Sequence, residues 1–170
     1  MTTNKLYLRL SKAHRLLKSG CSLESVHKVI KYPGHTYLLR CELERLLGYT
    51  FRKNQRHPEM IKDACSFISV RYNGNDFVVT QMAKRQYCRQ YSLDISEWDN
   101  SWTNHLCDNL KAALSRDGAY KTTHKRAVRS EDLVFSLISD LVIGVEIRVD
   151  NYIPASGIDG LANVLALKHP

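Results

Sequence analysis

The side chains best suited to chemistry in this sequence are five cysteines and a few acidic residues near position 140. The cysteines are Cys21, Cys41, Cys65, Cys88 and Cys107. A structural zinc site normally needs a closely spaced ligand pair such as Cys-x-x-Cys. No such pair occurs and the number of cysteines is odd. We therefore expect reduced thiols, mostly packed as small apolar groups, and neither a metal nor another cofactor.

Asp140 and the segment Glu146-Ile147-Arg148 resemble a nuclease pattern in which an acidic residue precedes Glu-x-Lys. Here the spacing is short, and arginine replaces lysine. Glu131 and Asp132, expected on the same helix as Asp140, would help to hold Mg²⁺. A capped helix and an exposed strand face explain these residues equally without catalysis, and no nucleophile elbow, phosphate loop or metalloprotease motif occurs. We expect no enzyme, with a metal-dependent nuclease as an alternative.

The excess of positive charge is confined to the first third of the chain. Residues 1–57 hold twelve lysines and arginines against three glutamates, a net charge of +9, whereas residues 58–170 hold thirteen against fourteen acidic residues. Such segregation is typical of a surface that binds a polyanion, although a merely solubilising basic face is the alternative. The division predicts two parts, a basic unit over residues 1–57 and a second domain over residues 58–170.

The positions of apolar residues predict three helices in the basic unit. The first runs from Lys5 to Lys18 and ends before Gly20. Ser22 is a suitable N-cap for a short second helix, and the sequence Tyr32-Pro33-Gly34 predicts a turn. A third helix is expected from His35 or Thr36 to Leu47, closed by Gly48. Its expected apolar side consists of Leu38, Leu39, Leu43, Leu46 and Leu47.

The second and third helices resemble a single helix-turn-helix unit of the AraC type. Residues 22–32 (SLESVHKVIKY) are similar to the first half of that unit, and residues 35–40 (HTYLLR) with 47–50 (LGYT) are similar to its recognition helix. Residues 8–17 resemble the helix that precedes it. The sequence departs from the family at His27 (usually alanine), at Lys31 (usually glycine) and at Phe51 (usually proline), and it has one extra residue between Arg40 and Gly48.

The resemblance implies that the third helix enters the major groove of DNA with its N-terminal residues first. Arg40 is the best candidate for a contact to a base, because its guanidinium can bond guanine bidentately. The residues expected near the bases are His35, Thr36, Tyr37 and Arg40. The residues expected at phosphates, which position a protein without specifying sequence, are Lys31, Arg45, Arg52, Lys53, Arg56, Arg9, Lys12 and Arg15. A basic loop provides a further phosphate contact or is simply solvated: Lys121, His124, Lys125, Arg126 and Arg129.

The remainder of the chain predicts an α+β fold with a small sheet. Asn73-Gly74-Asn75 lies between two β-branched and aromatic runs and predicts a β-hairpin over residues 66–80. The other expected elements are helices over 59–65, 99–116, 130–143 and 158–166, a connection over 51–58, a loop over 121–129 and a strand over 145–149.

These features together predict a sequence-specific DNA-binding protein, a transcriptional regulator. Because one small helix-turn-helix unit binds weakly alone, we expect a homodimer on double-stranded DNA, with residues 58–170 supplying the dimer surface, an effector pocket or a protein-partner site. The alternatives are a protein-binding inhibitor or adaptor of the mobile-element type, a nuclease, or an RNA binder. The longest apolar run is too short to span a membrane and no signal peptide is evident, so we expect a cytoplasmic protein with no membrane contact.

Overall fold

The computed structural model describes residues 2–53, 56–118 and 124–147. Three helices come first: α1 (Thr3–Lys18), α2 (Leu23–Val29) and α3 (Thr36–Glu42), the last continued by a π-helical turn, Leu43–Leu47. They are followed by β1 (Ile68–Tyr72), β2 (Asn75–Val79), α4 (Gln81–Gln90) and α5 (Asn100–Asp117). The described chain ends with β3 (Lys125–Arg129), β4 (Leu133–Ile138) and β5 (Leu141–Ile147). The predicted α+β class is confirmed.

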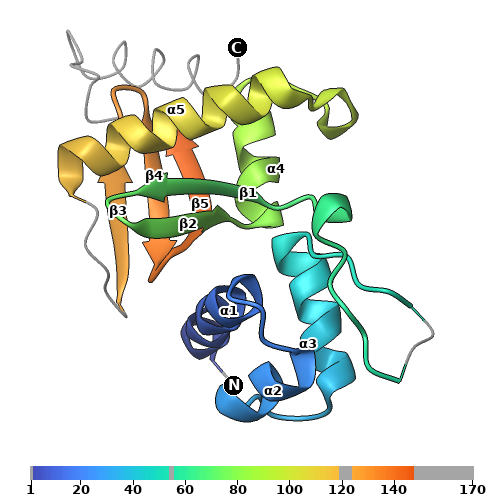
Figure 1. The fold of residues 1–170 in the computed structure, drawn as a ribbon. Helices are drawn as coiled ribbons and strands as arrows, with labels where there is room; N and C mark the ends of the chain where they lie inside the picture. The colour runs from blue at the N-terminus through green and yellow to red at the C-terminus, as the bar shows by residue number, and fades with distance from the viewer. Residues whose placement is uncertain (1, 54–55, 119–123, 148–170) are drawn as a thin grey trace, which may run out of the picture.

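The strands form one mixed sheet in the order β1-β2-β5-β4-β3. All neighbouring strands are antiparallel except β2 and β5, which run parallel. The long helix α5 runs across the sheet, and the three N-terminal helices group together to one side of it (Figure 1). None of the described helices has the length and apolar character needed to cross a membrane.

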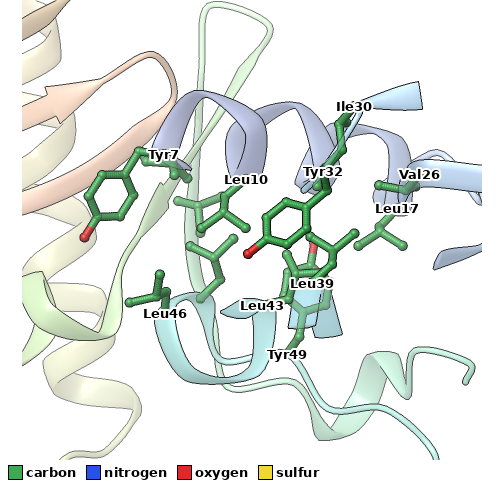
Figure 2. Packing of buried hydrophobic residues seen from close by; sticks show 14 of the residues in the cluster. Tyr7, Leu10, Leu17, Val26, Ile30, Tyr32, Leu39, Leu43, Leu46 and Tyr49 are labelled. Atoms are coloured by element: carbon green, nitrogen blue, oxygen red, sulfur yellow. The ribbon is translucent and has the colours of Figure 1, made fainter. Parts of the chain in front are cut away.

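Two apolar clusters hold the fold together. One lies between the sheet and α5, where Phe77, Leu110 and Phe135 are fully buried. The other fills the centre of the N-terminal helices, where Leu10, Leu39 and other apolar side chains point toward one another (Figure 2). The second cluster also includes side chains of the sheet, Val78, Ile138 and Leu141. The basic unit therefore packs against the sheet.

Several predicted elements are confirmed by their local chemistry. The side chain of Ser22 accepts a hydrogen bond from the backbone N–H of Ser25 at 3.2 Å, which caps α2. Asn73 and Gly74 both have positive φ, 49° and 75°, as the two-residue turn of a twisted hairpin requires. Helix α5 starts at the cap Asp99 and ends before Gly118, close to the predicted bounds.

The predicted helix over residues 130–143 is wrong, because this segment forms the hairpin of β4 and β5. Leu133, Phe135 and Leu137 alternate into the core, and Ser139 takes a φ of 53° in the turn. The strand predicted over residues 145–149 is part of β5, which contains Val145 and Ile147. This strand begins at Leu141, earlier than expected.

Other differences are smaller. The predicted loop over residues 121–129 contains the edge strand β3, and the helix expected over 59–65 is reduced to a 3-10 turn, Lys62–Ala64. Helix α4 lies in a segment for which no element was predicted. The helix expected over 158–166, Lys121 and the end of the strand expected over 145–149 lie outside the described residues.

Candidate nucleic-acid interface

Helices α2 and α3 form a corner that is fixed by the turn between them. Val26, Ile30 and Leu39 are buried on the inner side of this corner. The Nε2–H of His27 donates a hydrogen bond to the carbonyl oxygen of Gly34 at 2.8 Å, and Gly34 has a φ of 90°. The side chain that replaces the small alanine of the AraC-type pattern therefore ties α2 to the turn before α3.

Lys31 adopts the left-handed backbone conformation, with a φ of 52°. The AraC-type pattern has glycine at this position, and glycine is the residue that takes this conformation without steric cost. We expect Lys31→Gly to raise the free energy of unfolding by about 0.5 to 1 kcal/mol, measured by urea denaturation. A loss of stability would mean that the lysine side chain supports the turn.

Helix α3 buries one side and exposes the other. Leu39, Leu43, Leu46 and Leu47 are buried, in agreement with the prediction. Leu38 does not belong to this apolar side: 48% of it is exposed, because it lies about 100° around the helix from Leu39 and about 140° from Leu43. Tyr37 is 61% exposed, and the exposed side chains of His35 and Arg45 lie on the same helix and its π-helical extension.

Arg40 is largely covered by its neighbours on α3. Its side chain is only 16% exposed, and its guanidinium lies 4.8 Å from the centroid of the Tyr37 ring. Its Nε is 3.8 Å from the carboxylate of Glu44. The guanidinium lines a shallow groove of about 180 Å³, together with Glu24, Thr36, Tyr37, Arg56 and Pro58. In this conformation a base contact by Arg40 requires the side chain to leave the tyrosine ring.

The segment that was predicted as a connection is an arm that returns beside the helical corner. Phe51 and Met60 form an antiparallel bridge at its base, where the N–H of Arg52 donates to the carbonyl oxygen of Glu59 at 2.9 Å. Farther along, Nδ1 of His57 lies 2.5 Å from the carboxylate of Glu24 on α2. Arg52, Lys53 and Arg56 are all exposed on this arm. Arg40 of α3 and Arg56 of the arm, which are distant in sequence, therefore line the same groove.

All three acidic residues of the basic unit are matched with basic side chains of the same unit. Glu42 accepts a hydrogen bond from Arg45 at 2.7 Å, Glu44 faces Arg40, and Glu24 contacts His57. These pairs join residues whose spacing ranges from three to 33 positions. Sequence spacing indicates the two pairs within α3 but not the pair between Glu24 and His57.

The cations of α1 are divided between solvent and the sheet. Lys12 is exposed and Arg9 is half-buried. Arg15 lies 3.8 Å from the buried carboxylate of Asp140, and Lys18 lies 3.6 Å from Asp76 of β2. Arg15 therefore joins the helical unit to the sheet, a role that the sequence did not indicate.

Three members of the possible second set of phosphate contacts, Lys125, Arg126 and Arg129, lie on β3, on the opposite side of the molecule from α3 (Figure 1). His124 precedes this strand and is exposed. Lys125 and Arg129 are exposed, and Arg129 is 3.8 Å from Asp117. Arg126 is half-buried and donates to the carbonyl oxygen of Gly118 at 3.2 Å. The structure does not bring these residues together with the helical corner.

The prediction that the acidic residues considered for Mg²⁺ share a helix is wrong. Glu131 and Asp132 precede β4, whereas Asp140 follows it, so they lie about 20 Å apart along an extended strand. In the described part of the chain, no three histidine, cysteine or acidic side chains are grouped as they would be around a metal ion. All five cysteines are free thiols; Cys88 is buried, Cys21 is exposed and the others are half-buried.

No family model, curated protein or solved structure matches this chain.

Proposed function

We propose that the chain is a sequence-specific DNA-binding protein, a transcriptional regulator that acts as a dimer on double-stranded DNA. The observation that carries this proposal is the helical corner itself. It presents cations from two helices and the Phe51–Met60 arm, while the unit's acidic residues are occupied by basic partners. Residues 1–57 have a net charge of +9. Arg15 and Lys18 pair with acidic residues of the sheet, so the positive field rests mainly on exposed cations of the corner and the arm, Lys28, Lys31, Arg52, Lys53 and Arg56.

In this proposal α3 is the recognition helix. His35, Thr36 and Tyr37 face the bases, and Arg40 moves from the Tyr37 ring to a guanine when DNA is bound. Lys31, Arg45 and the arm cations contact phosphates on either side of the groove. The α1 cations Arg9 and Lys12 add to the same field, whereas Arg15 contributes less because Asp140 partly neutralises it.

Selection of binding sites from random duplex DNA tests the proposal. A dimer should select an inverted repeat with half-sites about one helical turn apart, and log K should fall linearly as log salt rises. Arg40→Ala is expected to relax the preference at one base pair, at a cost of about 1 to 3 kcal/mol against the selected site. Lys53→Ala is the matched control: it should weaken all sequences alike and reduce the salt slope by about one.

A protein-binding adaptor is the second candidate, because the same corner also exposes the apolar side chains Val29, Tyr37 and Leu38. Binding by such an adaptor would not depend steeply on salt or on DNA sequence, unlike binding by a DNA-binding regulator. Failure to select any sequence, with no effect of Arg40→Ala or Lys53→Ala on residual binding, would reject the DNA-binding proposal and favour this class.

A further inference from the structure

The exposed apolar side chains of the molecule are concentrated on the helical corner. Six large apolar residues are exposed among those described, and Val29, Tyr37 and Leu38 belong to α2 and α3. A single exposed leucine needs no explanation. Two consecutive exposed apolar residues at the start of a helix, Tyr37 and Leu38, within a strongly basic unit, indicate a ligand that offers both negative charge and apolar groups.

The end of the Leu38 side chain packs against the turn before α3. Its Cδ1 lies so close to the Gly34 backbone that a Cβ on Gly34 would stand 2.7 Å from it. Gly34 is in turn bonded to His27 of α2. Beside it, the Tyr37 ring is covered on one face by the Arg40 guanidinium. The start of α3 therefore presents a small apolar surface made by Tyr37 and Leu38.

Exposed cations precede and follow this apolar surface along the chain. Lys28 is exposed at the end of α2, and Lys31 is exposed in the turn that follows it. Arg45 is exposed on the π-helical turn that continues α3. Double-stranded DNA matches this combination, because phosphates flank a major groove in which thymine displays a 5-methyl group. RNA does not match it, since uracil lacks that methyl group and the A-form major groove is too deep and narrow for side chains to read.

We propose that Leu38 contacts the 5-methyl group of a thymine in the major groove and selects a T·A pair at that position. This inference rests on the proposed DNA-binding function and adds a specificity-determining residue to it. Leu38 has no hydrogen-bonding group in its side chain, so it can distinguish bases only through this hydrophobic contact.

Replacing thymine by deoxyuridine, one position at a time in the selected site, tests the inference because only the methyl group is removed. With the unaltered protein, replacing one particular thymine of each half-site should lower the affinity for DNA about fourfold, which is the effect of losing one buried methyl group. Leu38→Ala should bind the thymine and deoxyuridine duplexes equally. Met82→Ala, which truncates an exposed apolar residue on α4 (41% exposed), should retain the fourfold difference.

The outcomes separate the inference from the function beneath it. If DNA is bound with sequence preference but no deoxyuridine position matters, or if the difference persists in Leu38→Ala, Leu38 does not read a methyl group and the DNA-binding proposal stands. If no duplex is bound in preference to another, both fall. Circular dichroism of Leu38→Ala checks that the variant is folded, which its half-exposed position favours.

Discussion

Lowering the pH from about 7 to about 4.5 is expected to reduce the free energy of unfolding by about 2 kcal/mol through His14 alone. This histidine lies on α1 and is only 1% exposed. Burial lowers its pKa from 6.5 to about 4, and the nearby cations Lys18 and Arg15 act in the same direction, against the smaller opposing effect of Asp76. The folded protein therefore contains a neutral imidazole.

The direction of the effect follows from the two pKa values. Between about pH 4 and 6.5 the unfolded chain binds a proton on this histidine and the folded chain does not. The stability that His14 contributes is thus complete above pH 6.5 and is lost as the pH falls toward 4. The neutral ring is held by Tyr49, whose hydroxyl lies 2.5 Å from Nδ1, and burial raises the pKa of that tyrosine as well.

Urea denaturation over this pH range measures the effect. His14→Gln should flatten the dependence of stability on pH, whatever it does to stability at neutral pH. His35→Gln, which changes an exposed histidine, is the control and should leave the dependence as steep as before. An unchanged slope in His14→Gln would show that other groups dominate acid unfolding.

Local chemistry explains why much of the fold could be predicted. The hairpin of β1 and β2 depends on Asn73 and Gly74, two adjacent residues that tolerate positive φ. The hairpin of β4 and β5 has no such signal, because its turn is Ser139-Asp140 and its apolar residues fit both a helical and an alternating pattern. The choice between them is made by pairing with β2 and β3, which a local pattern cannot reveal.

The candidate interface likewise has features that follow from local sequence and features that depend on packing. Its charge and its three helices are properties of short segments and were predicted. The exposure of Leu38, the cover of Arg40 by Tyr37 and the contact between Glu24 and His57 depend on side-chain packing in three dimensions. The sequence offers one usable signal for Leu38. Four other leucines, Leu39, Leu43, Leu46 and Leu47, already form the buried side of the third helix, so a fifth leucine is not needed there.

Gly48→Ala is expected to destabilise the protein by about 3 kcal/mol. Gly48 ends the helical rod of α3 with a φ of 84°, a conformation that costs other residues about 1 to 2 kcal/mol. A Cβ there would also lie 2.6 Å from the Gln81 side chain, 2.8 Å from Ser66 Oγ and 3.1 Å from the backbone nitrogen of Phe67. The added overpacking costs a further 1 to 3 kcal/mol, roughly, because the backbone cannot rotate away.

Gly74→Ala is the matched control for backbone strain alone. Gly74 has a similar φ of 75°, but a Cβ there meets nothing within 4 Å. Chemical denaturation should give about 1 kcal/mol for Gly74→Ala, and the difference between the two variants measures the steric clash. Adding Gln81→Ala to Gly48→Ala should recover only part of the loss, because the Phe67 backbone remains in place. Equal destabilisation of the two glycine variants would mean that α3 does not abut the start of the sheet domain as tightly as these distances require.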